Sequence, residues 1–243
     1  MPTWKLTLEY DGTRYRGWQS QKNTDRTVQG ALATAAGELL GADVSLGGAG
    51  RTDAGVHALA QVGHLKTRRA LAEADLVWGL NERLPHDINV LEAEKAPVGF
   101  HARHDAVSRT YLYRISRRRT AFDKRFVWWV RDRLDFSSMR RAAKIFEGRH
   151  DFASFCENPQ GQESTLVVVN ESELLDWEHE IHYRVEASHF LWKMVRRLVG
   201  TLVEVGRGNL SDAEVERLLA SRSPEPAKWT APPSGLFLEK VKY

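Results

Sequence analysis

The sequence has a single cysteine, Cys156, among its 243 residues. One cysteine cannot form an intrachain disulfide, so the chain lacks the composition of a disulfide-stabilised secreted domain. No apolar run approaches the length of a membrane span, and the N-terminal residues lack the apolar core of a signal peptide. We therefore expect a cytoplasmic protein that does not enter a membrane.

Motifs for bound cofactors are missing as well. Neither a Gly-x-Gly-x-x-Gly fingerprint nor a Walker phosphate loop occurs. Two histidine pairs lie three positions apart, His101 with His104 and His179 with His182, but neither pair has a convincing further set of ligands. We expect neither a cofactor nor a metal ion.

The charge balance permits nucleic acid as a partner without requiring it. The net charge is +3 and the isoelectric point is about 9.0. Arginines recur in short clusters, at 117–119, 140–141 and 196–197. Their planar guanidinium groups suit phosphate, although solvated surface faces would explain the clusters equally well.

The pattern of apolar residues predicts an α+β chain with two α/β subdomains, which we divide at residues 1–104 and 105–243. Strands are expected at 3–10, 44–49, 59–66, 88–93, 106–116, 165–175, 180–187 and 236–241, and helices at 28–40, 72–83, 136–147, 189–205 and 211–220. Thr27 and Gly41 are expected to cap the first helix, and Ser211 opens a capping box. The segment 125–130 is expected to be a buried strand or core. Residues 223–234 carry four prolines and are expected to form a loop.

One loop carries the strongest chemical signal, because it places Asp53 between Gly50 and Gly55. Glycines allow tight turns that other residues resist, and Arg51 supplies a positive charge two positions from the carboxylate. Such a loop suits a nucleophile or an acid–base group. It also suits a structural turn in which the aspartate bonds its own backbone, and the residues alone favour that interpretation.

The run Gly50-Arg51-Thr52-Asp53-Ala54-Gly55-Val56-His57-Ala58 resembles the signature of the tRNA pseudouridine synthase A family. The resemblance extends along nearly the whole chain, through residues 8–12, 17–21, 100–103, 109–113, 148–152, 190–196 and 231–236. It implies a pseudouridine synthase fold, in which mostly antiparallel sheets join into a continuous sheet around a central RNA-binding cleft. It also implies an isomerase without a cofactor that converts uridine to pseudouridine at positions 38 to 40 of the tRNA anticodon stem-loop.

Matching motif to motif assigns roles to individual residues. The resemblance implies that Asp53 is the catalytic nucleophile or base and that Arg196 pairs with it. Tyr111 would contact the uracil, with Tyr113 as a structural partner, and Arg51 would help hold the target nucleotide out of its helix. The uracil pocket would be walled by Phe190, Leu236 and Val56.

The remaining expectations concern partners. Arg14, Arg16 and Lys22 follow the first strand and are candidates for RNA phosphate contact, or are simply exposed charges. The resemblance implies tRNA as substrate and a homodimer. Two departures from the family pattern stand out: Lys193 and Arg197 add charge to the 190–197 segment, and 164–169 is more apolar than the family's. A noncatalytic RNA-binding protein and an unrelated aspartate hydrolase remain as alternatives.

Overall fold

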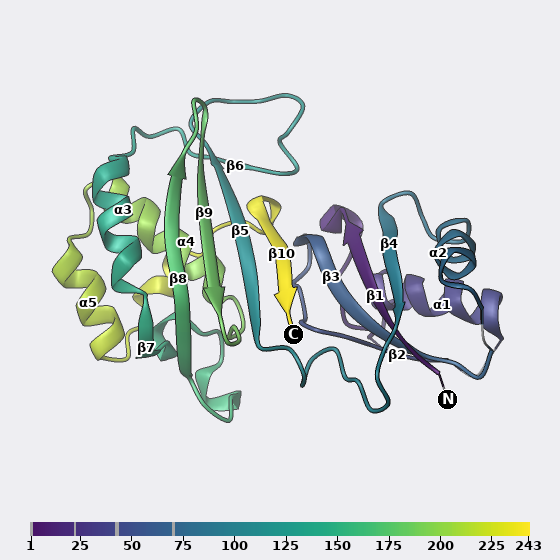
Figure 1. Ribbon diagram of the computed structural model, residues 1–243. Helices are drawn as coiled ribbons and strands as arrows, with labels where there is room; N and C mark the ends of the chain where they lie inside the picture. The colour runs from purple at the N-terminus through teal and green to yellow at the C-terminus, as the bar shows by residue number, and fades with distance from the viewer. Residues whose placement is uncertain (1, 22, 42–43, 70) are drawn as a thin grey trace. The chain divides into compact units, whose positions relative to one another are not determined.

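The structure, a computed structural model, describes residues 2–21, 23–41, 44–69 and 71–243. The chain divides into two compact units (Figure 1). The first comprises Met1–Val107 together with Phe237–Tyr243, and the second comprises Ser108–Leu236. Each unit contains both a sheet and helices, so the predicted mixture of α and β elements with mostly antiparallel strands is confirmed.

In the first unit, strands follow one another in the order β4-β1-β3-β10, and β2 pairs with β3. All of these pairings are antiparallel except that of β10 with β3, which is parallel. Helices α1 and α2 pack beside each other against the sheet (Figure 1). The strands are β1 (Thr3–Tyr10), β2 (Ser45–Gly48), β3 (His57–Lys66), β4 (Ile88–Lys95) and β10 (Leu236–Lys242), and the helices are α1 (Val28–Leu40), α2 (Glu73–Asn81) and a 3-10 turn at Gly12–Arg14.

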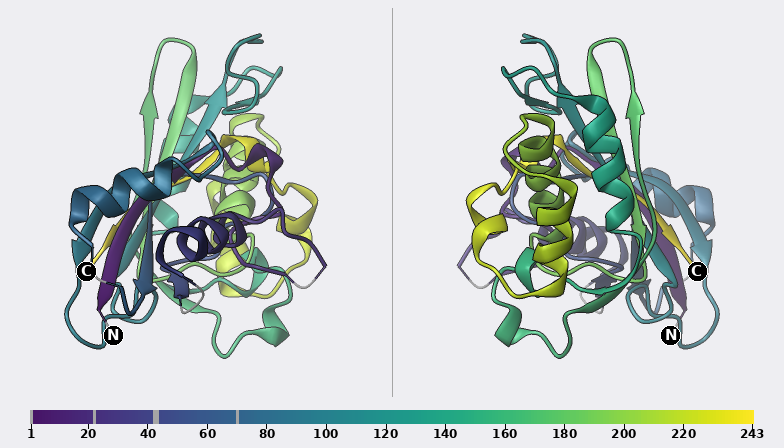
Figure 2. Two further views of the ribbon diagram at one scale, coloured as in Figure 1. Left: turned by 90° about the vertical axis from the view of Figure 1, so that its right-hand side faces the viewer. Right: turned by 90° about the vertical axis from the view of Figure 1, so that its left-hand side faces the viewer.

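In the second unit, the strand order is β5-β9-β8-β7, with β6 parallel to β5. Helices α3, α4 and α5 lie side by side on one face of this sheet (Figure 2). The strands are β5 (Ser108–Ser116), β6 (Trp128–Trp129), β7 (Gly148–Asp151), β8 (Leu166–Asp176) and β9 (Glu180–Ala187). The helices are α3 (Phe136–Ile145), α4 (Met194–Gly206), α5 (Asp212–Ala220) and α6 (Glu225–Lys228), with 3-10 turns at Ala153–Phe155, Pro159–Gly161 and Pro233–Gly235.

The predicted helix caps are confirmed. The Thr27 hydroxyl accepts a hydrogen bond from the Gly30 backbone N–H at 3.1 Å, which satisfies one of the unpaired amides of the first turn of α1. Gly41 follows the helix with φ 94°, in the region that favours glycine. At α5, Ser211 and Glu214 form the reciprocal capping box.

The helix expected over 189–205 begins later, at Met194. The reason is local, because Lys193 adopts a left-handed conformation with φ 60° and the preceding residues therefore cannot continue the helix backwards. Once begun, α4 is buried along nearly its whole length.

Two further expectations are wrong in part. The segment 223–234 is not wholly a loop, because it contains α6, whose prolines occupy the start of the helix where no backbone N–H is needed. Only Trp128–Trp129 of the segment 125–130 form a strand, β6. Trp129 is 43% exposed, so this segment belongs only partly to the core. Within the described residues, no helix combines the length and apolar character that crossing a bilayer requires.

Candidate functional site

Asp53 opens a tight turn. The Val56 backbone N–H donates to the Asp53 carbonyl oxygen at 3.1 Å, and Gly55 at the third position has φ 77°. A turn with a positive φ at its third position favours glycine there. The turn interpretation and the catalytic interpretation of this loop are therefore compatible, since the turn engages the backbone of Asp53 and leaves its side chain partly exposed.

The aspartate loop, residues 50–56, forms hydrogen bonds with residues 10–18, which comprise the end of β1 and the segment after it. These bonds involve residues before and after Asp53. The Gly55 N–H donates to the Tyr15 carbonyl at 3.3 Å, and the Trp18 N–H donates to the Thr52 carbonyl at 3.1 Å. The Thr52 and Tyr10 hydroxyl groups lie 2.8 Å apart in the core. These bonds fix the backbone of the aspartate loop from residues about 40 positions away in the sequence.

The close approach of the two segments depends on Gly12. A Cβ at this position would lie 1.9 Å from the Val56 carbonyl oxygen, which is far inside van der Waals contact. The Gly12 N–H also donates to His57 Nδ1 at 3.0 Å. The imidazole of His57 is buried and stacks on Phe237 with ring centroids 4.8 Å apart, so this histidine belongs to the architecture of the loop.

Arg51 is oriented by a chain of side-chain amides. Its Nε donates to Gln19 Oε1 at 3.0 Å, and Gln19 Nε2 donates to Gln29 Oε1 at 2.7 Å. Gln29 Nε2 is in turn anchored on the Leu46 carbonyl at 2.9 Å. The guanidinium is thus held in place from helix α1. Sequence reasoning missed both glutamines, although Gln19 falls within a matched family segment.

In the second unit, Tyr111 on β5 packs against Phe190. Their rings meet edge to face, with centroids 4.9 Å apart and an interplanar angle of 82°. Tyr113, two residues along the same strand, is fully buried and its hydroxyl donates to the Pro232 carbonyl at 2.8 Å. Burial raises the pKa of Tyr113 well above its usual range, so this tyrosine stays protonated. Tyr113 has the environment of a structural residue, as expected.

Arg196 lies on α4, close to the same C-terminal segment. Its Nε donates to the Ala231 carbonyl at 2.6 Å, and the Ala231 N–H donates back to the Arg196 carbonyl at 3.0 Å. Its neighbour Arg197 is buried and is paired with Glu157 and the Cys156 carbonyl. Leu236, at the start of β10, is only 5% exposed.

The three candidates for phosphate contact fare differently. Arg14 donates from Nε and Nη2 to Asp87 at 2.9 and 2.6 Å, and this hydrogen-bonded carboxylate raises the pKa of the arginine. Arg16 is exposed. Lys22 lies outside the described residues.

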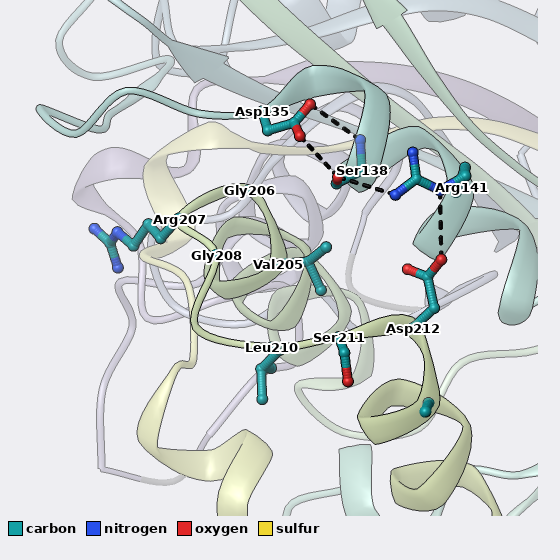
Figure 3. Close-up of a pocket in the computed structure, with 11 residues that line it drawn as sticks. Asp135, Ser138, Arg141, Val205, Gly206, Arg207, Gly208, Leu210, Ser211 and Asp212 are labelled. Atoms are coloured by element: carbon teal, nitrogen blue, oxygen red, sulfur yellow. Dashed lines mark hydrogen bonds and ion pairs between the residues drawn. The ribbon is translucent and has the colours of Figure 1, made fainter.

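A pocket of about 560 Å³ in the second unit lies among α3, α4 and α5 (Figure 3). Along one side, Arg141 connects Ser138, itself bonded to Asp135, with Asp212 through hydrogen bonds (Figure 3). These polar groups cap and join helices. Tyr111, Phe190, Arg196 and Leu236 do not line the pocket.

Histidine pairs were the only metal candidates that the sequence offered. The rings of His101 and His104 lie close, with centroids 4.2 Å apart. Within the part of the chain that the structure describes, no three His, Cys, Asp or Glu side chains gather as a metal site would require.

Comparison with known proteins identifies the family. The profile of the family described as tRNA pseudouridine synthase matches residues 7–105 and 142–243. Curated relatives align over the full length of both chains. They include tRNA pseudouridine synthase A of Rhodopseudomonas palustris at 43% identity, that of Afipia carboxidovorans at 41%, and tRNA pseudouridine synthase A 2 of Bacillus cereus at 36%. The chain therefore belongs to the tRNA pseudouridine synthase family, and as a member it is an isomerase that converts uridine in tRNA to pseudouridine.

Proposed function

We propose that this isomerase modifies uridines at positions 38 to 40 of the tRNA anticodon stem-loop, with Asp53 as its catalytic carboxylate and without a cofactor. The observation that carries the catalytic assignment is the aspartate loop itself. Its backbone is fixed by hydrogen bonds on both sides of Asp53, yet the side chain is partly exposed. A carboxylate on a rigid backbone can be presented to a ribose in a fixed orientation, which is what positioned chemistry requires.

The reaction rearranges one nucleoside without changing its oxidation state. The bond from ribose C1′ to uracil N1 breaks, a bond from C1′ to uracil C5 forms, and the proton lost from C5 is balanced by one gained at N1. Asp53 acts either by attack on the sugar or by removal of a proton from it. Both steps need an ionised carboxylate close to the ribose.

The roles of the other residues follow the family resemblance. We assign Arg196 as the charge partner that keeps the carboxylate ionised, because a nearby guanidinium lowers a carboxyl pKa. Tyr111 and Phe190 are assigned to the uracil, and their edge-to-face contact supports a shared aromatic surface. Leu236 and Val56 are assigned to the pocket wall, and both are nearly fully buried.

Arg51 is assigned to holding the target nucleotide out of the stem. A stacked base is unreachable, and extrusion costs a few kcal/mol that contacts in the flipped state must offset. The anchoring of Arg51 through two glutamines supports this assignment, since a pre-oriented side chain loses less freedom when it binds. Arg14, Arg16 and Lys22 are assigned to weaker phosphate contacts.

We further propose that the protein is a cytoplasmic homodimer, as the resemblance implies. Light scattering coupled to size-exclusion chromatography measures this directly. A mass of one chain, 27.6 kDa, across the working concentration range would contradict the dimer.

The central test is product mapping on an unmodified tRNA transcript. Asp53→Asn keeps the size of the side chain and removes its charge, so we expect no pseudouridine from this variant while tRNA binding is retained. Asp75→Asn is the matched control, because Asp75 is an exposed residue in the first turn of α2, and it should form product at the wild-type rate. Product from Asp53→Asn would refute the catalytic assignment. Binding by the wild type without product would favour the noncatalytic RNA-binding alternative.

A further inference from the structure

A pocket of about 310 Å³ in the first unit adjoins the aspartate loop. Gly50 and Arg51 form part of its wall, and the rest includes Gln19, a second arginine and three histidines. These are Arg103, His64, His101 and His104. None of the described residues that line this pocket is acidic, so its wall combines positive charge with hydrogen-bond donors. Asp105 lies outside the wall and accepts from the His101 backbone N–H at 2.9 Å.

We infer that this pocket binds a phosphodiester group of the tRNA backbone beside the target uridine. The inference rests on the proposed function only in placing the target near the aspartate loop. Phosphate oxygens accept several hydrogen bonds at once and carry a negative charge, which is the chemistry that this wall complements.

Hydrogen bonds from the backbone determine which ring nitrogen of His64 and of His101 carries the hydrogen. His64 Nδ1 accepts from the Ala102 backbone N–H at 3.2 Å, and His101 Nδ1 accepts from the Arg103 and His104 backbone N–H groups at 3.2 and 3.3 Å. A neutral imidazole whose Nδ1 accepts carries its hydrogen on Nε2. Each ring therefore has an Nε2–H available as a donor. Burial lowers the pKa of both histidines, which favours this neutral form.

The rings also form one continuous wall. The centroids of His64 and His101 lie 4.5 Å apart, and those of His101 and His104 lie 4.2 Å apart. On the opposite side, Gly47 of β2 meets His64 so closely that a Cβ there would lie 2.9 Å from His64 Nε2. Any side chain at position 47 would therefore crowd His64 Nε2, and both residues line the pocket.

The arginines supply charge in a suitable geometry. Gln19 holds Arg51 through Nε, and that bond does not use the terminal nitrogen atoms of the guanidinium. Arg103 is exposed and follows directly on the backbone turn that fixes His101. Guanidinium groups bind phosphate through two parallel, charge-assisted hydrogen bonds. These are stronger than the hydrogen bonds that neutral histidines alone can donate.

The inference predicts a change in salt dependence. When a protein neutralises a phosphate, counterions are released, so each phosphate contact adds about one to the slope of log affinity against log salt concentration. We would measure the affinity for an unmodified tRNA transcript at several salt concentrations, with every pocket variant built on Asp53→Asn so that the RNA is not turned over. Arg103→Gln combined with His104→Gln should weaken binding about 10-fold and reduce the slope by about one.

Arg83→Gln provides the matched control. Arg83 is an exposed arginine of the same unit that donates to the Gly79 carbonyl at 2.8 Å and does not line the pocket. Its affinity and salt slope should equal those of the Asp53→Asn parent. Thermal unfolding midpoints confirm that each variant is folded, and if the double variant unfolds, Arg103→Gln alone carries the same slope measurement.

Two outcomes would overturn the inference. Parental affinity and slope in the pocket variants would show that no phosphate binds there. Weaker binding with an unchanged slope would show that the pocket holds a neutral part of the nucleotide. A failure of the proposed function gives a different signature, namely pseudouridine formed by Asp53→Asn, and the slopes measured on that protein would still decide the phosphate question.

Discussion

The candidate residues of the two units are held in place by different means. In the first unit, the aspartate loop has no regular structure of its own and takes its shape from hydrogen bonds donated or accepted by residues 10–18. In the second unit, Tyr111 and Arg196 lie on a strand and a helix. Regular elements orient their side chains by their own periodicity, whereas an irregular loop depends on its neighbours.

This difference predicts how substitutions act in each unit. A substitution near the aspartate loop should act on activity even when it lies outside the loop, because it moves the backbone that presents the carboxylate. A substitution on α4 should act mainly through the side chain that is lost. Neighbouring residues on that helix can therefore have quite separate effects, which makes them suitable for a paired experiment.

The largest expected effect is that of Arg196→Met compared with Arg197→Met. If Arg196 is the charge partner of the carboxylate, its loss should reduce kcat about 1,000-fold, equivalent to about 4 kcal/mol, as for a single strong electrostatic contact. Arg197 instead binds Glu157 and the Cys156 carbonyl. Its loss should lower the free energy of unfolding by about 2 kcal/mol, because the Cys156 carbonyl would lose its donor and Glu157 would keep Lys193 but lose its buried partner.

Single-turnover kinetics and thermal unfolding of both variants would check this pair. Near-normal turnover in Arg196→Met would show that the carboxylate has another partner. Equal effects of the two variants on activity would remove the distinction between them.

The next effect concerns the backbone of the aspartate loop, through Gly12→Ala. The added methyl group would lie 1.9 Å from the Val56 carbonyl, so the two segments must separate. We expect about a 100-fold loss of activity and about 1–3 kcal/mol of stability, the usual cost of overpacking.

Gly37→Ala is the control for Gly12→Ala. Gly37 lies in α1, and a Cβ there would meet nothing within 4 Å. Alanine in a helix should stabilise the protein by about 0.5–1 kcal/mol and leave activity unchanged. Full activity in a folded Gly12→Ala protein would show that the aspartate loop tolerates displacement.

Much of the fold was accessible from sequence because it is encoded locally. Alternating apolar residues predict β1, and Thr27 with Gly41 defines both ends of α1. The catalytic candidate was accessible for a similar reason, since Asp53 lies within an unbroken run of matched residues. The bonds that shape its loop were not visible, because Tyr15 contributes only a backbone carbonyl and any residue could do so.

Contacts between residues that are distant in the sequence could not be predicted either. His64 lies on β3 and His101 in the loop between β4 and β5, and only the folded chain brings their rings together. The spacing of His101 and His104 is that of a metal-binding pair, whereas in the structure both line the pocket beside the aspartate loop. The start of α4 was misplaced because the left-handed conformation of Lys193 has no signal in the apolar pattern.

The smallest expected effect concerns the chain of side-chain amides that orients Arg51. Its loss would show whether side chains, as well as backbone contacts, position residues in the first unit. Gln29→Ala removes both the acceptor for Gln19 and the anchor on the Leu46 carbonyl, so Arg51 should sample more orientations. We expect kcat/KM to fall about 3- to 10-fold, in line with the loss of about 1 kcal/mol for one hydrogen bond. Gln29→Glu keeps an oxygen acceptor for Gln19 and for the Ser20 N–H, but it loses the donor to Leu46 and adds a negative charge to the wall of the pocket inferred to bind phosphate. It should therefore raise KM for tRNA while recovering most of kcat. If alanine and glutamate lower kcat alike, the acceptor on residue 29 does not orient Arg51. The backbone bonds would then account for all of the positioning in the aspartate loop.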